Sequence, residues 1–280
     1  MPDNVDHGRA YKLQIKGLIR FSYLTEGGFA ISERGEDIAR KTIYDPDRLL
    51  RRFALFENLT LRSLKLQTNP AFHMGVLIGD DFPRDAAHHL ATLLADVPQA
   101  RIIRLPRMVH YRAMRIAFEK MGDDPEATHT ASLRLDDDDA IHKDWMAHIA
   151  ALAPALGAAR GYDAPLVIAA NRGFYFDLNN PQDPVSEWYE KQPISVGTTL
   201  ITPRSAHENI YLRNHRKLSE FYDCFSSVTQ PMFLRSVHQD NDSHALSSGH
   251  QGKMRGPEIE EQLRSGFGLS FEDLRQTHVS

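Results

Sequence analysis

Apolar residues along the first half of the chain alternate between strand-like and helix-like patterns. Short apolar runs predict four buried strands, over residues 17–24, 72–79 and 101–105 and from residue 129 into the four aspartates at 136–139. Apolar positions at helical spacing predict helices over residues 45–67, 85–94, 108–121 and 143–156. Strands that alternate with helices indicate βαβ units, which build a parallel sheet with helices on both faces. We therefore expect an α/β fold.

The predicted helix over residues 45–67 has the clearest start signal. Asp45 can cap its first turn, and Pro46 suits the first helical position. Three arginines lie largely off the apolar stripe of this helix, on a side that is usually solvated. Of these, Arg51 or Arg52 could reach a phosphate.

Beyond residue 154 the pattern changes to strand-like segments joined by loops. These segments cover residues 166–170, 173–178 and 195–201. Asn171-Arg172-Gly173 fits a hairpin turn between the first two. Residues 238–257 are polar and glycine-containing, which predicts a mobile loop, and residues 257–274 predict one or two C-terminal helices. No linker rich in Ser, Gly or Pro separates the halves, so we expect a mixed sheet added to the first sheet.

Composition and charge exclude several classes of protein. The chain has 280 residues, of which 41% are hydrophobic and 25% charged, as in an ordinary globular protein. A net charge of -4 argues against a general nucleic-acid binder. No apolar run predicts a transmembrane segment, and the first residues do not resemble a secretory signal. Cys224 is the only cysteine, which fits a reducing compartment, so we expect a cytoplasmic protein.

Four consecutive aspartates, Asp136 to Asp139, follow the fourth predicted strand. In extended backbone Asp136 and Asp138 would point to one face, and Asp137 and Asp139 to the other. Like charges this close repel, and a hard divalent cation relieves the repulsion because it prefers oxygen ligands. A metal site is therefore one interpretation, and a solvated acidic turn is the other. The apolar residues on both sides of the run favour the metal site.

The position of the run in the predicted fold strengthens this interpretation. In parallel α/β sheets, ligands bind outside the carboxyl ends of the strands. Asp80 follows the second predicted strand and would lie at the same edge as the four aspartates. An EF-hand loop is excluded on spacing, because counting from Asp136 places Ile141 at the glycine position and Ala147 at the glutamate position.

Several segments resemble a known class of enzyme. They are residues 19–22 (IRFS), 48–57, 63–68 (SLKLQT) and, above all, 134–140 (RLDDDDA). On them the chain resembles the GT-A class of nucleotide-sugar glycosyltransferases, and within it the bacterial family labelled putative rhamnosyltransferases. The resemblance implies a GT-A-type, Rossmann-like parallel sheet with helices on both faces, extended by a mixed sheet in the second half. We expect a single domain over residues 1–280, with a nucleotide-sugar-binding half at about 15–145 and an acceptor-side half at about 146–280.

The resemblance also implies roles for the acidic run. In this class an Asp-x-Asp after the fourth strand meets the metal, the diphosphate and the donor ribose, and aligning the preceding apolar residues places that pair at Asp136 and Asp138. Asp138 would bind Mn²⁺ or Mg²⁺, which neutralises the departing nucleoside diphosphate. Asp80 would accept a hydrogen bond from a pyrimidine base. The residues expected to bind the donor are Arg20, Phe21, Ser22, Asp80, Arg112, Asp136 and Asp137, and those expected to hold the metal are Asp136, Asp138 and His238.

An inverting transferase also needs a base within hydrogen-bond reach of the acceptor hydroxyl. This residue usually comes from the second half of the chain. Asp240 is the leading candidate, with Glu208 and Asp242 behind it, and Asp139 is expected to face the acceptor or to hold the turn.

The resulting hypothesis is a metal-dependent glycosyltransferase. It would move a sugar, rhamnosyl if the family label holds, from a dTDP- or UDP-linked donor to a hydroxyl of a glycan or lipid-linked acceptor, with inversion. A lipid-linked acceptor would bring the protein to the inner membrane face. The alternatives are a metal-dependent phosphoesterase or nucleotidyltransferase, and a non-catalytic module that binds divalent ions or carbohydrate.

Overall fold

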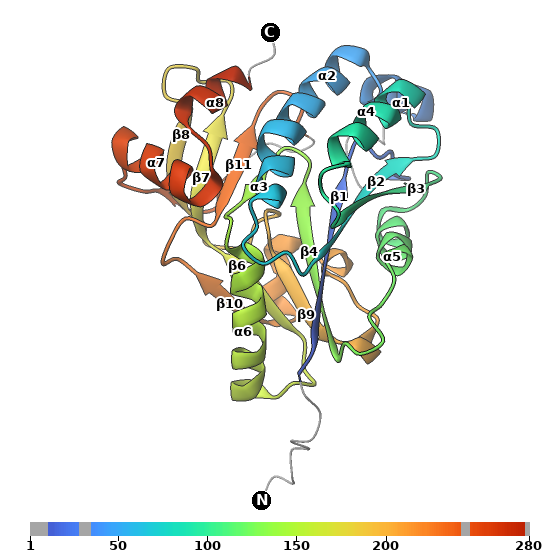
Figure 1. Ribbon diagram of the computed structural model, residues 1–280, viewed down its shortest axis with the longest axis vertical. Coiled ribbons are helices and arrows are strands. Elements are labelled where there is room, and N and C mark those ends of the chain that lie inside the picture. Colours follow the sequence, from blue (N-terminus) through green and yellow to red (C-terminus); the bar gives the residue numbers. More distant parts are fainter. Residues whose placement is uncertain (1–10, 28–34, 242–246, 278–280) are drawn as a thin grey trace, which may run out of the picture.

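The computed structural model describes residues 11–27, 35–241 and 247–277. Its centre is a seven-stranded, mostly parallel sheet (Figure 1). In spatial order the strands are β10 (Asp223–Ser227), β6 (Leu166–Ala170), β9 (Thr199–Pro203), β4 (His129–Asp136), β1 (Leu13–Arg20), β2 (His73–Gly79) and β3 (Ala100–Leu105). The four strands from β4 to β3 are parallel neighbours, and β9 runs antiparallel to both β4 and β6. The predicted parallel sheet of the first half is confirmed.

Helices cover both faces of this sheet. One face packs against α2 (Pro46–Leu55), α3 (Arg62–Lys65), α4 (Arg84–Leu94) and α6 (Trp145–Arg160), and the other against α5 (His110–Lys120) and two 3-10 turns, Ile210–Leu212 and His215–Glu220. The division follows from strand geometry, because successive side chains point to opposite faces. On β1, Ile15 and Ile19 belong to the first layer, and Leu18 belongs to the second.

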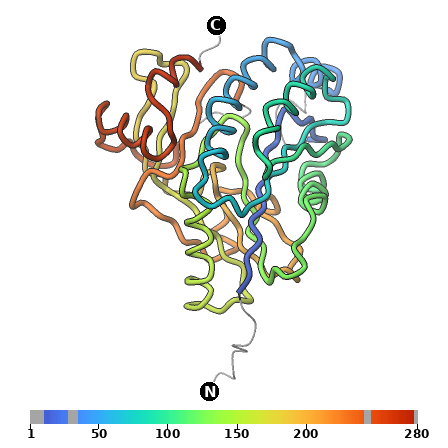
Figure 2. Tube along the Cα trace, in the orientation of Figure 1, coloured from blue at the N-terminus to red at the C-terminus, as the bar shows by residue number. Residues whose placement is uncertain are grey.

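A second, smaller sheet stands beside the first. It contains β12 (His250–Gln251), β8 (Val185–Tyr189), β7 (Arg172–Asp177), β11 (Phe233–Val237) and β5 (Ala140–Ile141). Figure 2 shows the C-terminal segment, in red, beside these strands. That segment comprises α7 (Gly256–Gln262), a π-helical turn (Leu263–Phe267) and α8 (Phe271–Gln276). The expected mixed sheet and C-terminal helices are confirmed. Because β5 follows the acidic run directly, the run links the two sheets.

The long helix that crosses the first sheet begins where the sequence predicts. The Asp45 side chain accepts a hydrogen bond of 2.9 Å from the Arg48 backbone amide, and Pro46 is the first helical residue. After α2 the helix continues as a π-helical segment, Phe56–Leu61, and then as α3. Within the π segment, the Thr60 hydroxyl donates to the Asp139 carbonyl at 2.8 Å.

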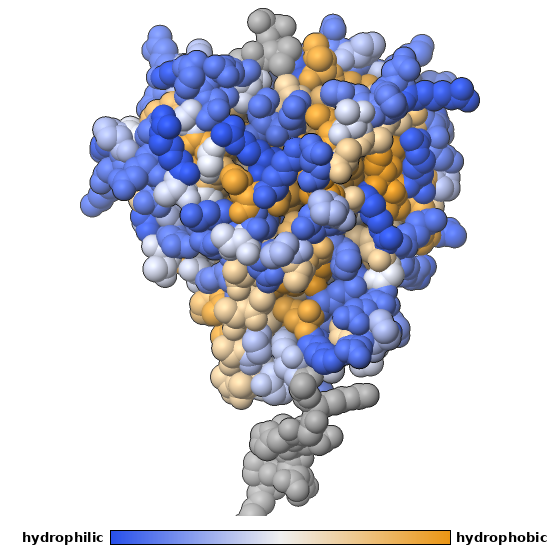
Figure 3. Space-filling view, viewed as in Figure 1, coloured by the Kyte–Doolittle hydropathy of each residue, from blue (hydrophilic) through white to orange (hydrophobic). Residues whose placement is uncertain are grey.

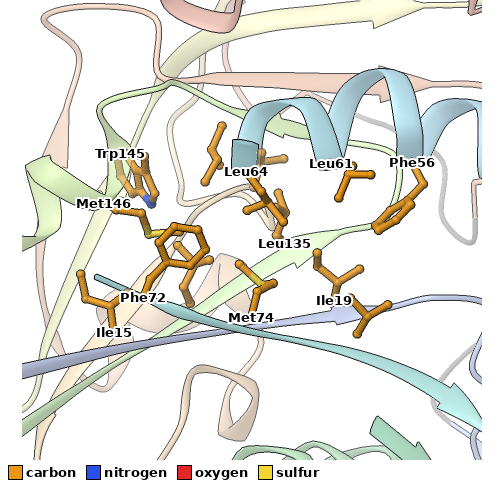
Figure 4. Packing of buried hydrophobic residues seen from close by; sticks show 14 of the residues in the cluster. Ile15, Ile19, Phe56, Leu61, Leu64, Phe72, Met74, Leu135, Trp145 and Met146 are labelled. Carbon is orange, nitrogen blue, oxygen red and sulfur yellow. The ribbon is translucent and has the colours of Figure 1, made fainter. Parts of the chain in front are cut away.

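Apolar packing fixes this helix over the strand ends. Figure 4 shows Phe56, Leu61 and Leu64 pointing toward side chains of the underlying strands, among them Ile19 and Leu135. All five side chains are at most 2% exposed, so each contributes about 1.5–3 kcal/mol of burial free energy. The packing holds α2 rigidly above the carboxyl ends of β1 and β4.

Some local predictions are wrong. The first strand covers residues 13–20 instead of 17–24, and the strand predicted over 195–201 begins only at Thr199. Asn171 does not start a hairpin, because β6 and β7 belong to different sheets. The alternation of the four aspartates ends at Asp136, since β4 stops there and a turn follows. The helix α1 (Glu36–Ile43) and the strands β5, β8, β10, β11 and β12 were not predicted.

Within the described ranges, no helix is long and apolar enough to cross a membrane. The face in Figure 3 is mainly hydrophilic, with a paler, apolar region at the lower left, where Figure 1 places α6. This helix leaves Ala151, Ala155 and Ala158 exposed.

Candidate functional site

A cavity of about 630 Å³ lies at the carboxyl ends of β1 and β4. Its wall contains seven arginines and five aspartates, so its formal charge is positive although the whole chain is acidic. The arginines are Arg20, Arg48, Arg52, Arg134, Arg213, Arg216 and Arg235, and the aspartates are Asp136, Asp137, Asp138, Asp139 and Asp240. Ligands of parallel α/β sheets bind at this edge.

Arg52 of α2 reaches down to the acidic run and pairs with two of its members. Its Nε donates to Asp137 at 3.2 Å, and its Nη2 contacts the other oxygen of the same carboxylate. Its Nη1 donates to Asp138 Oδ2 at 2.9 Å. The side chains of all three residues are at most 8% exposed, so this is a buried, multidentate ion pair. The turn after Asp136 makes it possible, because it brings both carboxylates to one guanidinium.

Asp138 has two further partners from the segment after β11. His238 Nε2 lies 2.8 Å from Asp138 Oδ2, and Asn241 Nδ2 donates to the same oxygen at 3.1 Å. Burial acts to raise the pKa of the Asp138 carboxyl, but the charge of Arg52 and the contact with His238 outweigh it, so the pKa lies below its ordinary value. Asp138 is therefore ionised at neutral pH.

Asp139 differs from its neighbours. Its Oδ1 accepts a hydrogen bond of 2.8 Å from the backbone amide of Ser236 on β11. Burial, followed by the charges of Asp138 and Asp136, raises the pKa of the Asp139 carboxyl well above its usual range. Arg235 lies in the same wall, where its guanidinium is held over the Tyr175 ring and donates to the Tyr175 hydroxyl at 3.3 Å.

The opposite wall combines arginines with neutral histidines. Arg134 of β4 lies 5.0 Å over the Tyr211 ring, and its Nη1 is 3.4 Å from His215 Nδ1. Burial, followed by the charge of Arg134, lowers the pKa of His215 to about 2. Burial and the charges of Arg20 and Arg134 lower the pKa of His110 to about 3. Both rings are thus uncharged at neutral pH, and the positive charge of this wall comes from arginine.

Two buried donors in the cavity wall are unsatisfied. Within the part of the chain that the structure describes, Arg134 Nε and Ser236 Oγ have no hydrogen-bond partner. A buried polar atom without a partner costs about 1–3 kcal/mol, so such atoms in a cavity indicate ligand contacts.

The structure brings together most of the residues expected at the site. Arg20 and Asp136 are register partners on β1 and β4, and Arg20, Ser22, Asp136, Asp137, Asp138, Asp139 and Asp240 all line the cavity. Asp240 is paired with Arg51, at 2.7 and 3.2 Å. Burial acts to raise the pKa of Asp240, but the hydrogen bond and charge of Arg51 outweigh it and lower the pKa. His238 and Asp240 also line a neighbouring cavity of about 220 Å³.

Other expected residues lie outside the cavity wall. Phe21 is fully buried in the core against Phe53, and the Glu208 carboxylate accepts a hydrogen bond of 3.0 Å from a tyrosine hydroxyl. Asp80 and Arg112 are exposed, although Asp80 does follow the end of β2 as expected. Their roles stay predictions. No sequence pattern indicates a role for Arg134, Arg213, Arg216 or Arg235, and Arg52 is predicted only to be able to reach a phosphate, because arginines are common on solvated surfaces.

The residues expected to hold a divalent metal do not fit one in this arrangement. Among the described residues, no group of three or more His, Cys, Asp or Glu side chains is arranged as a metal site. Asp138 Oδ2, one of the two oxygens of the expected ligand, has an arginine, a histidine and an asparagine nitrogen as neighbours. The guanidinium already supplies the positive charge that the acidic run requires.

Comparison with known families agrees with the resemblance seen in the sequence. A family model described as "Putative rhamnosyl transferase" matches residues 14–250. The chain belongs to this family. Membership in the rhamnosyl transferase family indicates a glycosyltransferase. No curated protein matches the sequence.

Solved structures with a similar arrangement include S. aureus TarS residues 1–349 in complex with UDP-GlcNAc, at 11% identity and a TM-score of 0.41. The match covers 90% of this chain and 64% of that one, so the chain spans less than two thirds of the TarS length. Mouse xyloside xylosyltransferase 1, in its apo form, matches at 9% identity and a TM-score of 0.31, over 71% of this chain and 70% of that one. At this identity, the roles of individual residues do not transfer from these structures.

Proposed function

We propose that the protein transfers a glycosyl group from a nucleoside diphosphate sugar to a hydroxyl of a glycan or lipid-linked acceptor, with inversion. The donor would be dTDP- or UDP-linked, and rhamnosyl is the first sugar to test. The observation that carries the proposal is the arginine-rich cavity at the carboxyl ends of β1 and β4, in a chain that belongs to the rhamnosyl transferase family.

The cavity suits a diphosphate. Guanidinium groups bind phosphate oxygens through paired N–H donors, and they keep their charge at any physiological pH. Arg134 offers a buried donor without a partner among the described residues, and Arg20 stands beside it at the end of the neighbouring strand. Asp136 ends β4 at the same level and would accept the ribose hydroxyls, while Ser22 would lie near the nucleotide.

Two of the expected acceptor-side carboxylates are candidates to reach a sugar bound in the cavity, and Asp242 lies outside the described residues. Asp139 and Asp240 line it, whereas Glu208 does not. Both oxygens of Asp240 are held by Arg51, and one oxygen of Asp139 is held by the Ser236 amide. We propose that one of these two acts as the general base, with the acceptor approaching through the smaller cavity that shares Asp240.

A divalent ion at Asp136, Asp138 and His238 stays a prediction from the sequence. For Asp138 to accept it, Arg52 and His238 would first have to release that carboxylate.

Binding and product analysis test the proposal. We expect UDP or dTDP to bind in calorimetric titration, and Arg134→Met to weaken that binding about 10- to 100-fold, as for loss of a hydrogen bond to a charged group. Arg115→Met is the matched control, because Arg115 pairs with Glu119 on the exposed side of α5. Incubation with donor and acceptor should release the nucleoside diphosphate. Release of pyrophosphate would indicate a nucleotidyltransferase instead, and binding of neither nucleotide would overturn the proposal.

A further inference from the structure

One oxygen of the carboxylate expected to bind metal is surrounded by nitrogen donors. Asp138 Oδ2 lies 2.9 Å from Arg52 Nη1, 2.8 Å from His238 Nε2 and 3.1 Å from Asn241 Nδ2. Its side chain is 5% exposed, and that of Arg52 is 8% exposed. A carboxylate oxygen that already accepts three hydrogen bonds has no lone pair left for a cation.

The hydrogen bonding of His238 fixes which of its nitrogens carries the proton. Its Nδ1 accepts a hydrogen bond of 3.2 Å from the Asp240 backbone amide, and a nitrogen that accepts is not protonated. The proton of the neutral ring is therefore on Nε2, which donates to Asp138. A histidine that ligates metal through Nε2 needs the opposite tautomer, with Nδ1–H donating to an acceptor. Here Nδ1 faces an N–H group, so this tautomer would set two donors against each other.

Arg52 holds the position that a divalent ion would take. It is bidentate to Asp137 and bonded to Asp138, and its Nη1 lies 3.4 Å from His238 Nε2. A cation beside Asp138 would lie within a few ångströms of this buried guanidinium, where repulsion is only weakly screened.

We infer that Arg52 takes the place of the divalent cation in this protein, and that the site binds its nucleoside diphosphate without metal. The inference rests on the proposed function for the identity of the ligand. Arg52 and His238 keep the acidic run neutralised and ordered, and the arginines of the cavity wall, Arg134 and Arg235 among them, bind the diphosphate. Arg52 is accordingly a positioning residue.

Titration with Mn²⁺ alone tests the inference on the full chain. Free Mn²⁺ gives a paramagnetic resonance signal that is lost on binding. We expect the wild-type protein, without UDP, to leave the signal of 1 mM Mn²⁺ unchanged. This concentration is on the order of one that would load an ordinary carboxylate site. Uptake of one Mn²⁺ per chain, abolished by Asp138→Asn, would overturn the inference.

The variant Arg52→Met is expected to gain the Mn²⁺ binding that the wild-type protein lacks. Without the guanidinium, Asp137 and Asp138 lack a cation, so Mn²⁺ should now bind and raise the thermal unfolding temperature of the variant while leaving that of the wild type unchanged. Arg115→Met, which removes an exposed guanidinium of α5 that pairs with Glu119, is the control and should not respond. If Arg52→Met does not fold, the wild-type titration still decides.

Nucleotide binding separates this inference from the proposed function. UDP affinity should agree within about threefold between EDTA and 1 mM Mn²⁺. A gain of thirtyfold or more with Mn²⁺, lost in Asp138→Asn, would refute metal independence while supporting the proposed function. If neither UDP nor dTDP binds in either buffer, the proposed function fails, and the titration with Mn²⁺ alone still tests Arg52.

Discussion

Replacing Arg52 by methionine should strongly destabilise the fold. The substitution keeps most of the side-chain volume but removes the charge that neutralises Asp137 and Asp138, whose side chains are 4% and 5% exposed. Removing one partner of a buried ion pair costs about 3–5 kcal/mol, because the remaining charge is left desolvated. Asp138 keeps the hydrogen bonds from His238 and Asn241, so most of the cost should come from Asp137.

This loss should depend on pH in a defined direction. In the wild type the pKa of Asp138 lies below its unfolded value, so the carboxylate contributes stability above that value and loses it as pH falls through the folded pKa. In Arg52→Met the penalty of burying uncompensated carboxylates is present while they are ionised, at neutral pH, and declines as they take up protons at lower pH. The difference in unfolding free energy between the two proteins should therefore be largest near pH 7 and shrink toward pH 4.

Urea denaturation followed by circular dichroism between pH 4 and 8 measures both effects. At neutral pH the expected loss corresponds to a drop of roughly 6–15 °C in the unfolding temperature. Arg51→Met should cost about 1 kcal/mol or less, because Arg51 is one-third exposed. Adding Asp137→Asn to Arg52→Met should recover part of the loss. A loss below 1 kcal/mol at pH 7, or one independent of pH, would show that the acidic run does not depend on Arg52.

Two further predictions concern the helix start and the buried histidines. Asp45→Ala removes the acceptor for the Arg48 amide and should lower the free energy of unfolding by about 1 kcal/mol in urea denaturation. Asp47→Ala, in the same exposed turn, is the control and should lower it clearly less. Equal losses in the two variants would contradict the capping role of Asp45. The folded protein holds His110 and His215 at pKa values of about 3 and 2, below the unfolded value of 6.5. Unfolding then takes up protons at acid pH, so the free energy of unfolding should fall as pH drops below 6.5. Replacing both histidines by Asn should make this dependence on pH less steep in denaturation curves. An unchanged dependence would contradict the assigned pKa values.

The strands and helices that could be predicted from the sequence are those with a clear pattern of apolar residues. The run over residues 72–79 and the helix over 85–94 match β2 and α4 within a residue or two. β2 is a continuous apolar run buried on both faces, and α4 buries one apolar face. β10 reads DCFSS and β5 has two residues, so neither carries a local signal. The hairpin prediction at Asn171 was wrong for another reason. Turn residues indicate where the chain changes direction, but they do not indicate which sheet the next strand joins.

In the candidate site, too, residues marked by their neighbours in sequence could be predicted, and contacts between distant residues could not. The carboxylates at the end of β4 could be predicted because they follow a buried strand directly, and such strand ends meet at one edge of a parallel sheet. Their partners could not be predicted, because Arg52 is 86 residues from Asp138 and His238 is 100 residues away. Only the folded chain shows that an arginine from one side and a histidine from the other meet at the same oxygen.

This arrangement changes the inference that an acidic run supports. Four adjacent carboxylates need compensation, and the sequence alone suggests an external cation because no internal one is visible. In the fold the four are no longer equivalent, since Asp137 and Asp138 share a guanidinium and Asp139 accepts a backbone amide hydrogen bond. Asp136 is left at the strand end facing Arg20 across the register, with both side chains in the cavity wall. The acidic run therefore anchors α2 and β11, and under the proposed function the arginines around it would provide the charge that attracts an anionic donor.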